Sequence, residues 1–140
     1  MALPNIVFGS SGLVGLSIIS HCIKKKTDYI YTSRDKPNCP NIKWLRLDLD
    51  KKISNFKYKH FNIGIFLSSP SYLKKNLKYS KFKKELHWLE KVTNNFLFSK
   101  LIYISSSTVY YKNHPIGEVK KKCEKYLNKN KHLFNNVQIW

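Results

Sequence analysis

The sequence is poor in arginine and in acidic residues, and it contains no long apolar run. Arg34 and Arg46 are its only arginines among 26 basic residues, and 8 residues are acidic. No stretch reaches about 18 consecutive apolar residues, and no basic segment precedes the first apolar run. These absences argue against a membrane-spanning helix and against a secretory signal peptide.

Cysteine is also scarce, and its positions form no metal-binding pattern. Cys22, Cys39 and Cys123 are odd in number and far apart in the chain. A disulfide framework is therefore not expected. The expectation is a cytoplasmic protein with reduced cysteines. The five histidines are scattered without metal-type spacing, so no metal site is expected either.

Lysine is the residue that the sequence has in excess, and it sets the net charge at +18. A basic surface is the usual mark of a nucleic-acid-binding protein. Here the lysines are spread along the chain and accompanied by many Asn, Ile and Tyr residues, the set that AT-rich codons encode. A solvated lysine surface is the preferred interpretation, so nucleic acid is not the expected partner. A polyanion-binding face stays open as an alternative.

Apolar residues follow strand-like and helix-like spacings in alternation along the chain. A length of 140 residues with 42% hydrophobic residues fits a single domain, 1–140. Alternating strands and helices predict an α/β fold, a doubly wound parallel sheet of Rossmann type with about six strands and helices on both faces. Strands are expected at 4–9, 29–34, 42–50, 62–70, 100–107 and 136–140, and helices over about 12 residues from Leu13, over 81–98 and over 115–129. The run at 62–70 is nearly continuous in apolar residues, which predicts burial on both faces.

The segment "IVFGSSGLVG" places three glycines between the first strand and the first helix. Such a turn brings the backbone close to a pyrophosphate, whose charge the helix N-terminus favours. We expect a tight turn at Gly9, the close approach at Gly12 and close helix–strand packing at Gly15. A Walker-type loop is disfavoured because no Lys-Ser/Thr follows the last glycine. The predicted cofactor-binding residues of this loop are Gly9, Ser10, Ser11, Gly12, Leu13 and Gly15.

Two further motifs follow the glycine loop in a recognisable order. "LDLD" follows the third expected strand, and "ISSSTVY" follows the fifth. Together with the glycine loop they resemble the NAD-dependent epimerase/dehydratase family, the extended and atypical short-chain dehydrogenases that act on sugar nucleotides. The resemblance implies that Asp48 and Leu49 lie beside the adenine of a bound dinucleotide. It also implies that Leu67, Ser68 and Ser69 lie beside the cofactor ribose.

The end of the second strand bears on which dinucleotide is bound. Arg34 comes 19 residues after Gly15, where members that prefer NAD usually carry an acid for the ribose hydroxyls. Ser33 and Arg34 instead offer a hydroxyl and a guanidinium, whose planar fork suits a 2′-phosphate. NADP is therefore the predicted cofactor, and Asp35 keeps NAD as the alternative.

The resemblance implies a catalytic serine, tyrosine and lysine, and the tyrosine has no counterpart. Ser106 matches the serine, with Ser107 next to it. "PIGEVKKKCEKYL" resembles the family's helix and matches Lys120 to the lysine and Glu124 to its glutamate, which leaves Ile116 at the tyrosine position. Isoleucine cannot titrate, so the usual acid/base is absent.

Two more departures concern the substrate site of that family. Five residues separate Tyr110 from Ile116, a shorter loop than the family's. The sequence ends at Trp140, where the family's substrate-binding portion begins, so a truncated chain without that portion is expected. Tyr79 and Lys83 form the only Tyr-x-x-x-Lys pair, which the composition explains by chance.

Three functions remain, in order of preference. The first is an NAD(P)-binding domain of the epimerase/dehydratase type that is catalytically impaired or silent, for which a sugar nucleotide would be a substrate only with the missing portion. The second is an active atypical reductase or epimerase using Ser106, Tyr110 or Tyr111, and Lys120. The third is a polyanion-binding protein that uses its lysine surface. A homo-oligomer stays open for each of them.

Overall fold

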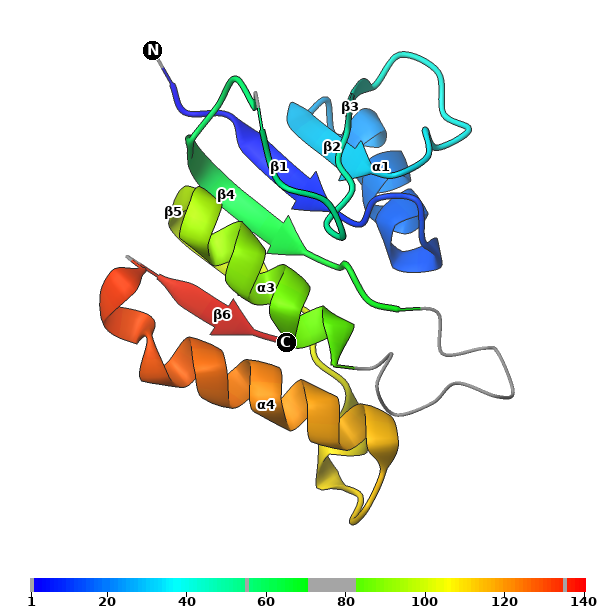
Figure 1. The fold of residues 1–140 in the computed structure, drawn as a ribbon. Helices are drawn as coiled ribbons and strands as arrows, with labels where there is room; N and C mark the ends of the chain where they lie inside the picture. The colour runs from blue at the N-terminus through cyan, green and yellow to red at the C-terminus, as the bar shows by residue number, and fades with distance from the viewer. Residues whose placement is uncertain (1, 55, 71–82, 135) are drawn as a thin grey trace.

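The fold is a single parallel sheet with helices on both faces (Figure 1). The computed structural model describes residues 2–54, 56–70, 83–134 and 136–140. The six strands are ordered β3-β2-β1-β4-β5-β6, and every pairing is parallel. The elements are β1 (Asn5–Phe8), α1 (Leu13–Lys24), β2 (Tyr29–Ser33), β3 (Lys43–Arg46), β4 (His60–Phe66), α3 (Lys84–Asn95), β5 (Leu97–Tyr103), the 3-10 turn η1 (Ser107–Tyr110), α4 (Pro115–Lys129), the 3-10 turn η2 (Lys131–Leu133) and β6 (Val137–Ile139). The predicted doubly wound α/β fold is confirmed.

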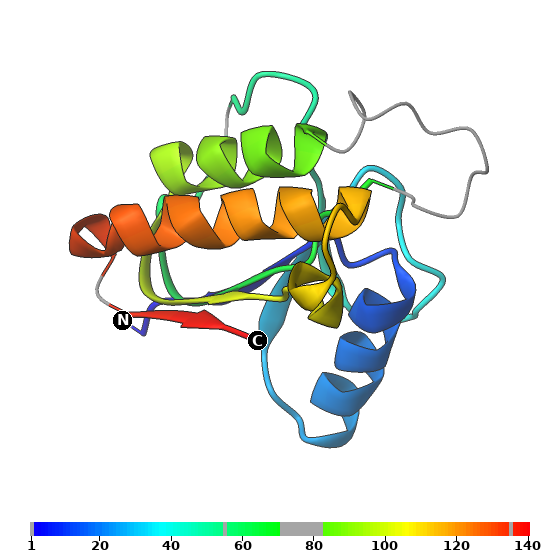
Figure 2. The same ribbon diagram turned by 90° about the horizontal axis from the view of Figure 1, so that it is seen from below.

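Side chains of successive strand residues point to opposite faces, and this alternation divides the core in two. On one face, Val7 and Tyr31 pack with Ile19 and Cys22 of α1. On the other face, strand residues two apart, such as Ile6 and Phe8, join the larger cluster beneath α3 and α4. Figure 2 shows α3 and α4 together on one side of the sheet and α1 on the other.

The helices expected from Leu13 and over 115–129 agree closely with α1 and α4. The helix expected over 81–98 ends at Asn95, and the strand expected at 100–107 lies at Leu97–Tyr103, because the chain is already extended at Phe96 and pairs with β4 from Leu97 on.

Two further strand predictions need correction. The strand expected at 42–50 ends at Arg46, because its neighbour β2 ends at Ser33, the residue that pairs with Arg46. The bond from the Leu47 amide to the Ser33 carbonyl is the last one between the two segments. The strand expected at 62–70 begins at His60, ends at Phe66 and is not buried on both faces. Ile63 and Ile65 are only half-buried, because α1 alone among the described helices covers their face.

The sheet topology determines where a ligand would bind. From β1 the chain moves through α1 to β2 on one side, and it later returns to place β4 on the other side of β1. The loops after β1 and β4 therefore leave the sheet in opposite directions, which opens a crevice at its carboxyl edge. None of the helices within the described residues is long and apolar enough to cross a membrane.

Candidate functional site

A cavity of about 210 Å³ lies at the carboxyl ends of four neighbouring strands. Of the cofactor-binding residues predicted from the sequence, all except Ser10, Leu13 and Gly15 line it. Segments far apart in the sequence therefore meet at the crevice that the topology opens. The lining residues are Gly9, Ser11, Gly12, Thr32, Ser33, Arg34, Leu47, Asp48, Leu49, Leu67, Ser68, Ser69 and Trp88.

Two of the three glycines are required by backbone packing. Gly9 has a φ of +82°, and a Cβ there would lie 2.7 Å from the Ser68 amide nitrogen. A Cβ on Gly15 would lie 2.5 Å from the Ser10 carbonyl oxygen. The tight turn at Gly9 is thus confirmed, whereas Gly15 packs against the loop at Ser10 and not, as predicted, against the strand. A side chain at either position would collide with the backbone.

Gly12 differs from the other two glycines because the fold does not require it. It has a φ of −80°, which any residue adopts, and the nearest atom to an added Cβ is the Gly9 carbonyl oxygen at 3.9 Å. A side chain at this position would point into open space beside the cavity. A glycine here keeps the backbone accessible to a ligand.

The N-terminus of α1 is suited to an anion. Its N-cap, Gly12, provides no side-chain cap, and no acidic residue lies in the first turn. By contrast, the His114 imidazole caps α4 by accepting a hydrogen bond from the Gly117 amide, and Glu118 lies in the first turn. The positive end of the α1 dipole is therefore not compensated by an acid of its own first turn. Ser10 is fully buried beneath the loop, where its hydroxyl donates to the Thr32 carbonyl at 3.1 Å.

Ser33 and Arg34, at the end of β2, both line the cavity but differ in how accessible they are to a ligand. The Ser33 hydroxyl accepts a hydrogen bond from the Trp44 indole at 2.9 Å and donates one to the Asp35 carbonyl at 2.6 Å. Its hydrogen-bonding capacity is thus largely used within the protein. The Arg34 side chain is exposed at the edge of the cavity, so its guanidinium is the more accessible of the two groups.

The segment after β3 forms an apolar wall that is held by α3. Leu47 and Leu49 are buried, and the Lys91 ammonium donates to the Leu49 carbonyl at 2.5 Å. Asp50 accepts hydrogen bonds from the Trp88 indole at 3.0 Å and from Lys84 at 3.3 Å. Partial burial alone would raise the pKa of Asp50, but these two donors outweigh it and lower that pKa below its usual value.

Sequence reasoning missed three lining residues: Thr32, Leu47 and Trp88. Thr32 and Leu47 are direct neighbours of predicted residues, so the strand ends already indicated their place. Trp88 lies beside the apolar stripe of the predicted helix, and its only signal was a large aromatic residue on a helix rich in charged residues. Its position over the crevice depends on how α3 packs.

The predicted catalytic serine and its neighbouring tyrosines lie around η1, outside the cavity lining. Ser106 is the N-cap of η1, and its hydroxyl accepts hydrogen bonds from the Thr108 amide at 3.2 Å and the Thr108 hydroxyl at 2.9 Å. Ser107 begins the turn. Tyr110 and Tyr111 are exposed, with 86% and 60% of their surface accessible. Lys112 follows Tyr111 in the chain, but among the described residues no hydrogen bond joins a lysine to either phenol.

Lys120, the predicted catalytic lysine, is held in a buried ion pair. Its ammonium lies 2.6 Å from Oε1 of Glu85 on α3 and also donates to the Ile104 carbonyl at 3.0 Å. Glu85 is 1% exposed and accepts a further hydrogen bond from the Tyr103 hydroxyl at 2.8 Å. The lysine therefore joins α4 to α3 and to the end of β5.

Burial dominates the titration of the groups around this ion pair. Burial raises the pKa of the Tyr103 hydroxyl far above its usual value, and the neighbouring Glu85 carboxylate adds to the effect. Burial also raises the pKa of the Cys123 thiol to about 12. Ile116 packs against the same core cluster, and Glu124 accepts a short hydrogen bond from the Ser105 hydroxyl. The residues around Lys120 therefore belong to the hydrophobic core and do not form an open site.

The remaining candidates from the sequence are the tyrosine–lysine pair, the cysteines and the histidines. Tyr79, the first member of that pair with Lys83, lies outside the described residues. In the part of the chain that the structure describes, no three His, Cys, Asp or Glu side chains are grouped to hold a metal ion. The three cysteines, Cys22, Cys39 and Cys123, are free thiols.

Similarity to known proteins is found at the level of structure. No protein-family profile and no curated protein sequence matches this chain. A UDP-galactose 4-epimerase has the same fold with a TM-score of 0.79 and 14% identity, over 98% of this chain and 55% of that one. MoeE5 in complex with UDP-glucose and NAD gives a TM-score of 0.73 and 14% identity, over 97% of this chain and 52% of that one. For a UDP-N-acetylglucosamine 4-epimerase from Bacillus cereus the values are 0.70 and 14%, over 99% and 52%.

This chain thus spans about half the length of the solved structures that it matches. The order of the sequence motifs predicted a resemblance to epimerases and dehydratases of sugar nucleotides, and UDP-sugar 4-epimerases are among the matched structures. At 14% identity the similarity establishes the Rossmann-type fold.

Proposed function

We propose that this chain binds a nicotinamide dinucleotide in the cavity at the carboxyl ends of β1 to β4, with the pyrophosphate at the N-terminus of α1. Gly12 is the observation that carries the proposal. The fold has room for a side chain at Gly12, but that side chain would occupy the space of a pyrophosphate bound to the α1 amides. The uncapped first turn of α1 and the presence of NAD in the MoeE5 structure support it.

The proposed dinucleotide is NADP. Because Ser33 is engaged with Trp44 and Asp35, the exposed Arg34 guanidinium is the group that would bind a 2′-phosphate. NAD remains the alternative, supported by Asp35 beside Arg34 and by the ligand of MoeE5.

The proposal includes a silent or impaired catalytic centre. A bound nicotinamide can accept or donate hydride, but the proton transfer that accompanies it in the resembled family needs a tyrosine and a lysine. Ile116 stands at the tyrosine position and packs against the core, and the Lys120 ammonium is bound to Glu85. Ile116 thus has no proton to transfer, and the Lys120 ammonium is buried in its contact with Glu85, which supports the proposal.

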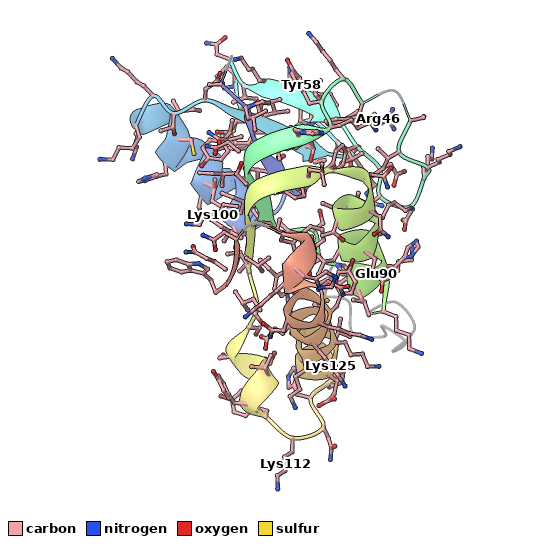
Figure 3. All side chains as sticks on the ribbon, turned by 90° about the vertical axis from the view of Figure 1, so that its left-hand side faces the viewer. Arg46, Tyr58, Glu90, Lys100, Lys112 and Lys125 are labelled. Carbon is pink, nitrogen blue, oxygen red and sulfur yellow. The ribbon has the colours of Figure 1, made fainter. Side chains whose placement is uncertain are left out.

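Two other functions can be weighed against this one. An active reductase or epimerase would use Ser106, Tyr110 or Tyr111, and Lys120, and the exposure of both tyrosines is the observation in its favour. Polyanion binding is supported by the net charge of +18. Basic side chains lie on different sides of the molecule, however, as Lys100, Lys112 and Lys125 illustrate (Figure 3). This distribution favours a solvated surface over one binding face.

Calorimetric titration of the purified chain with NADPH and with NADH tests the dinucleotide proposal. We expect binding of both, with NADPH the tighter ligand, and an absence of heat with both would overturn the proposal. The same chain, loaded with NADPH or NADP and given UDP-glucose, should show no turnover by absorbance of the reduced nicotinamide or by sugar analysis. Turnover that is lost in the Tyr110→Phe/Tyr111→Phe variant would instead favour the active enzyme.

A further inference from the structure

We infer that Trp88 is the base-contacting residue of this cavity, and that its indole packs against the adenine ring of the bound dinucleotide. This inference rests on the proposed function and adds to it a specificity-determining residue on α3.

The cavity lining divides by chemistry. Backbone amides and glycines come from the loop after β1, whereas Leu47, Leu49 and Trp88 come from the segment after β3 and from α3. β3 is two strands away from β1, which corresponds to roughly 10 Å across the sheet. A ligand with its phosphates at α1 would therefore carry its flat apolar group toward Trp88.

Trp88 is oriented by a hydrogen bond that leaves its ring available. Its indole N–H is already donated to Asp50 at 3.0 Å, and Lys84, one turn earlier on the same face of α3, binds both Asp50 oxygens at 3.3 Å. The side chain is half-buried and lines the cavity. With its polar atom engaged, the indole can offer a ligand only its aromatic surface.

The side chains around Trp88 provide separate places for a phosphate and for a base. Lys84 pairs with the Asp50 carboxylate at 3.3 Å, so its ammonium is engaged beside Trp88. Arg34 is the basic residue among those that line the cavity. A phosphate would therefore be held at Arg34, whereas the indole and the two leucines offer apolar surface to a neutral ring. Stacking of a nucleobase on an aromatic side chain contributes about 1–3 kcal/mol. The buried Leu47 and Leu49 side chains supply the apolar remainder of such a pocket.

Calorimetry on the full chain with three probes tests the inference: NADPH, adenosine 2′,5′-bisphosphate, and nicotinamide mononucleotide, which lacks adenine. Trp88→Leu should weaken the two adenine ligands by about 5- to 150-fold and leave the mononucleotide unchanged. Trp88→Phe, which keeps a ring, should restore most of the affinity. Trp140→Leu is the matched control, since Trp140 is 72% exposed and does not line the cavity.

A second readout does not depend on replacing Trp88. In the Trp44→Phe/Trp140→Phe variant, Trp88 is the only tryptophan. Because Trp44 donates a hydrogen bond to Ser33, calorimetry first establishes that this variant binds NADPH. Adenosine 2′,5′-bisphosphate should then change the fluorescence of Trp88, whereas nicotinamide mononucleotide should not. Unchanged emission on saturation, or a folded Trp88→Leu protein that binds NADPH as tightly as wild type, would overturn the inference. Wild-type protein that binds none of the probes would instead overturn the proposed function.

Discussion

At the scale of single residues, substitutions at Gly12 and Gly9 distinguish an effect on ligand binding from an effect on stability. Gly12→Val should abolish NADPH binding and leave the Tm close to that of wild type, because the added side chain enters the open space beside the cavity. Gly9→Val is the control, and it should lower the Tm, because the residue has a φ of +82° and its Cβ would meet the Ser68 backbone. Calorimetry and thermal unfolding measure both effects. Retained NADPH affinity in Gly12→Val would show that the pyrophosphate lies elsewhere.

Arg34 is expected to distinguish the two dinucleotides. Arg34→Ala should weaken NADPH binding by about 1.5–3 kcal/mol, the range for a hydrogen bond to a charged group, and should hardly change NADH binding. Arg46→Ala is a matched control, because Arg46 lies on β3 and does not line the cavity. An equal loss for both cofactors in Arg34→Ala would mean that the guanidinium supports the structure and does not bind the 2′-phosphate.

At the scale of elements, the ion pair of Lys120 and Glu85 joins α4 to α3. Lys120→Met should lower the free energy of unfolding by about 3–5 kcal/mol, because it leaves the Glu85 carboxylate buried without its cation. Lys121→Met removes the exposed partner of Glu118 and should change that free energy by less than about 1 kcal/mol. Denaturant unfolding of both variants measures the difference.

A double variant tests whether the loss comes from the unpaired charge. Glu85→Gln/Lys120→Met should be less destabilised than the two single changes together, because a neutral amide replaces the buried carboxylate. Additive losses, or a Lys120→Met protein as stable as Lys121→Met, would argue against a structural ion pair. The latter result would leave Lys120 free for the chemistry that the sequence motif implies.

At the scale of the whole molecule, the net charge of +18 opposes the compact state through self-repulsion. Raising NaCl from about 10 mM to 0.5 M shortens the Debye length and should raise the Tm. A gain of about 1 kcal/mol corresponds to roughly 2–8 °C for a domain of this size. A Tm that falls or stays constant with salt would show that the lysines are already compensated by other contacts.

The lysine surface should bind nucleic acid only without sequence preference. Affinity for single-stranded RNA should fall steeply between about 50 and 200 mM salt, because counterion release drives such binding. Fluorescence anisotropy with two oligonucleotides of different sequence measures the affinity and the preference. Tight, sequence-dependent binding at about 200 mM salt would favour the polyanion-binding alternative.

The sequence by itself determined the order of strands and helices, the doubly wound fold and the turn at the glycine loop. These features depend on neighbours in the chain: apolar spacing identifies α1 and α4, and three glycines between a strand and a helix allow little else than a tight turn. In a parallel sheet the carboxyl ends of all strands lie at the same edge. The predicted parallel topology therefore already implied that most of the predicted cofactor residues meet at one cavity.

Only the tertiary structure decided what α3 contributes. Trp88 and Asp50 are 38 residues apart, and Glu85 and Lys120 are 35 residues apart. Whether these side chains meet depends on how α3 packs against the segment after β3 and against α4. The apolar stripe of α3 indicates which face turns to the sheet, but not which distant side chains meet the residues that flank the stripe. The sequence motif therefore marked Lys120 as a catalytic lysine, and only packing showed that a buried carboxylate on another helix binds it.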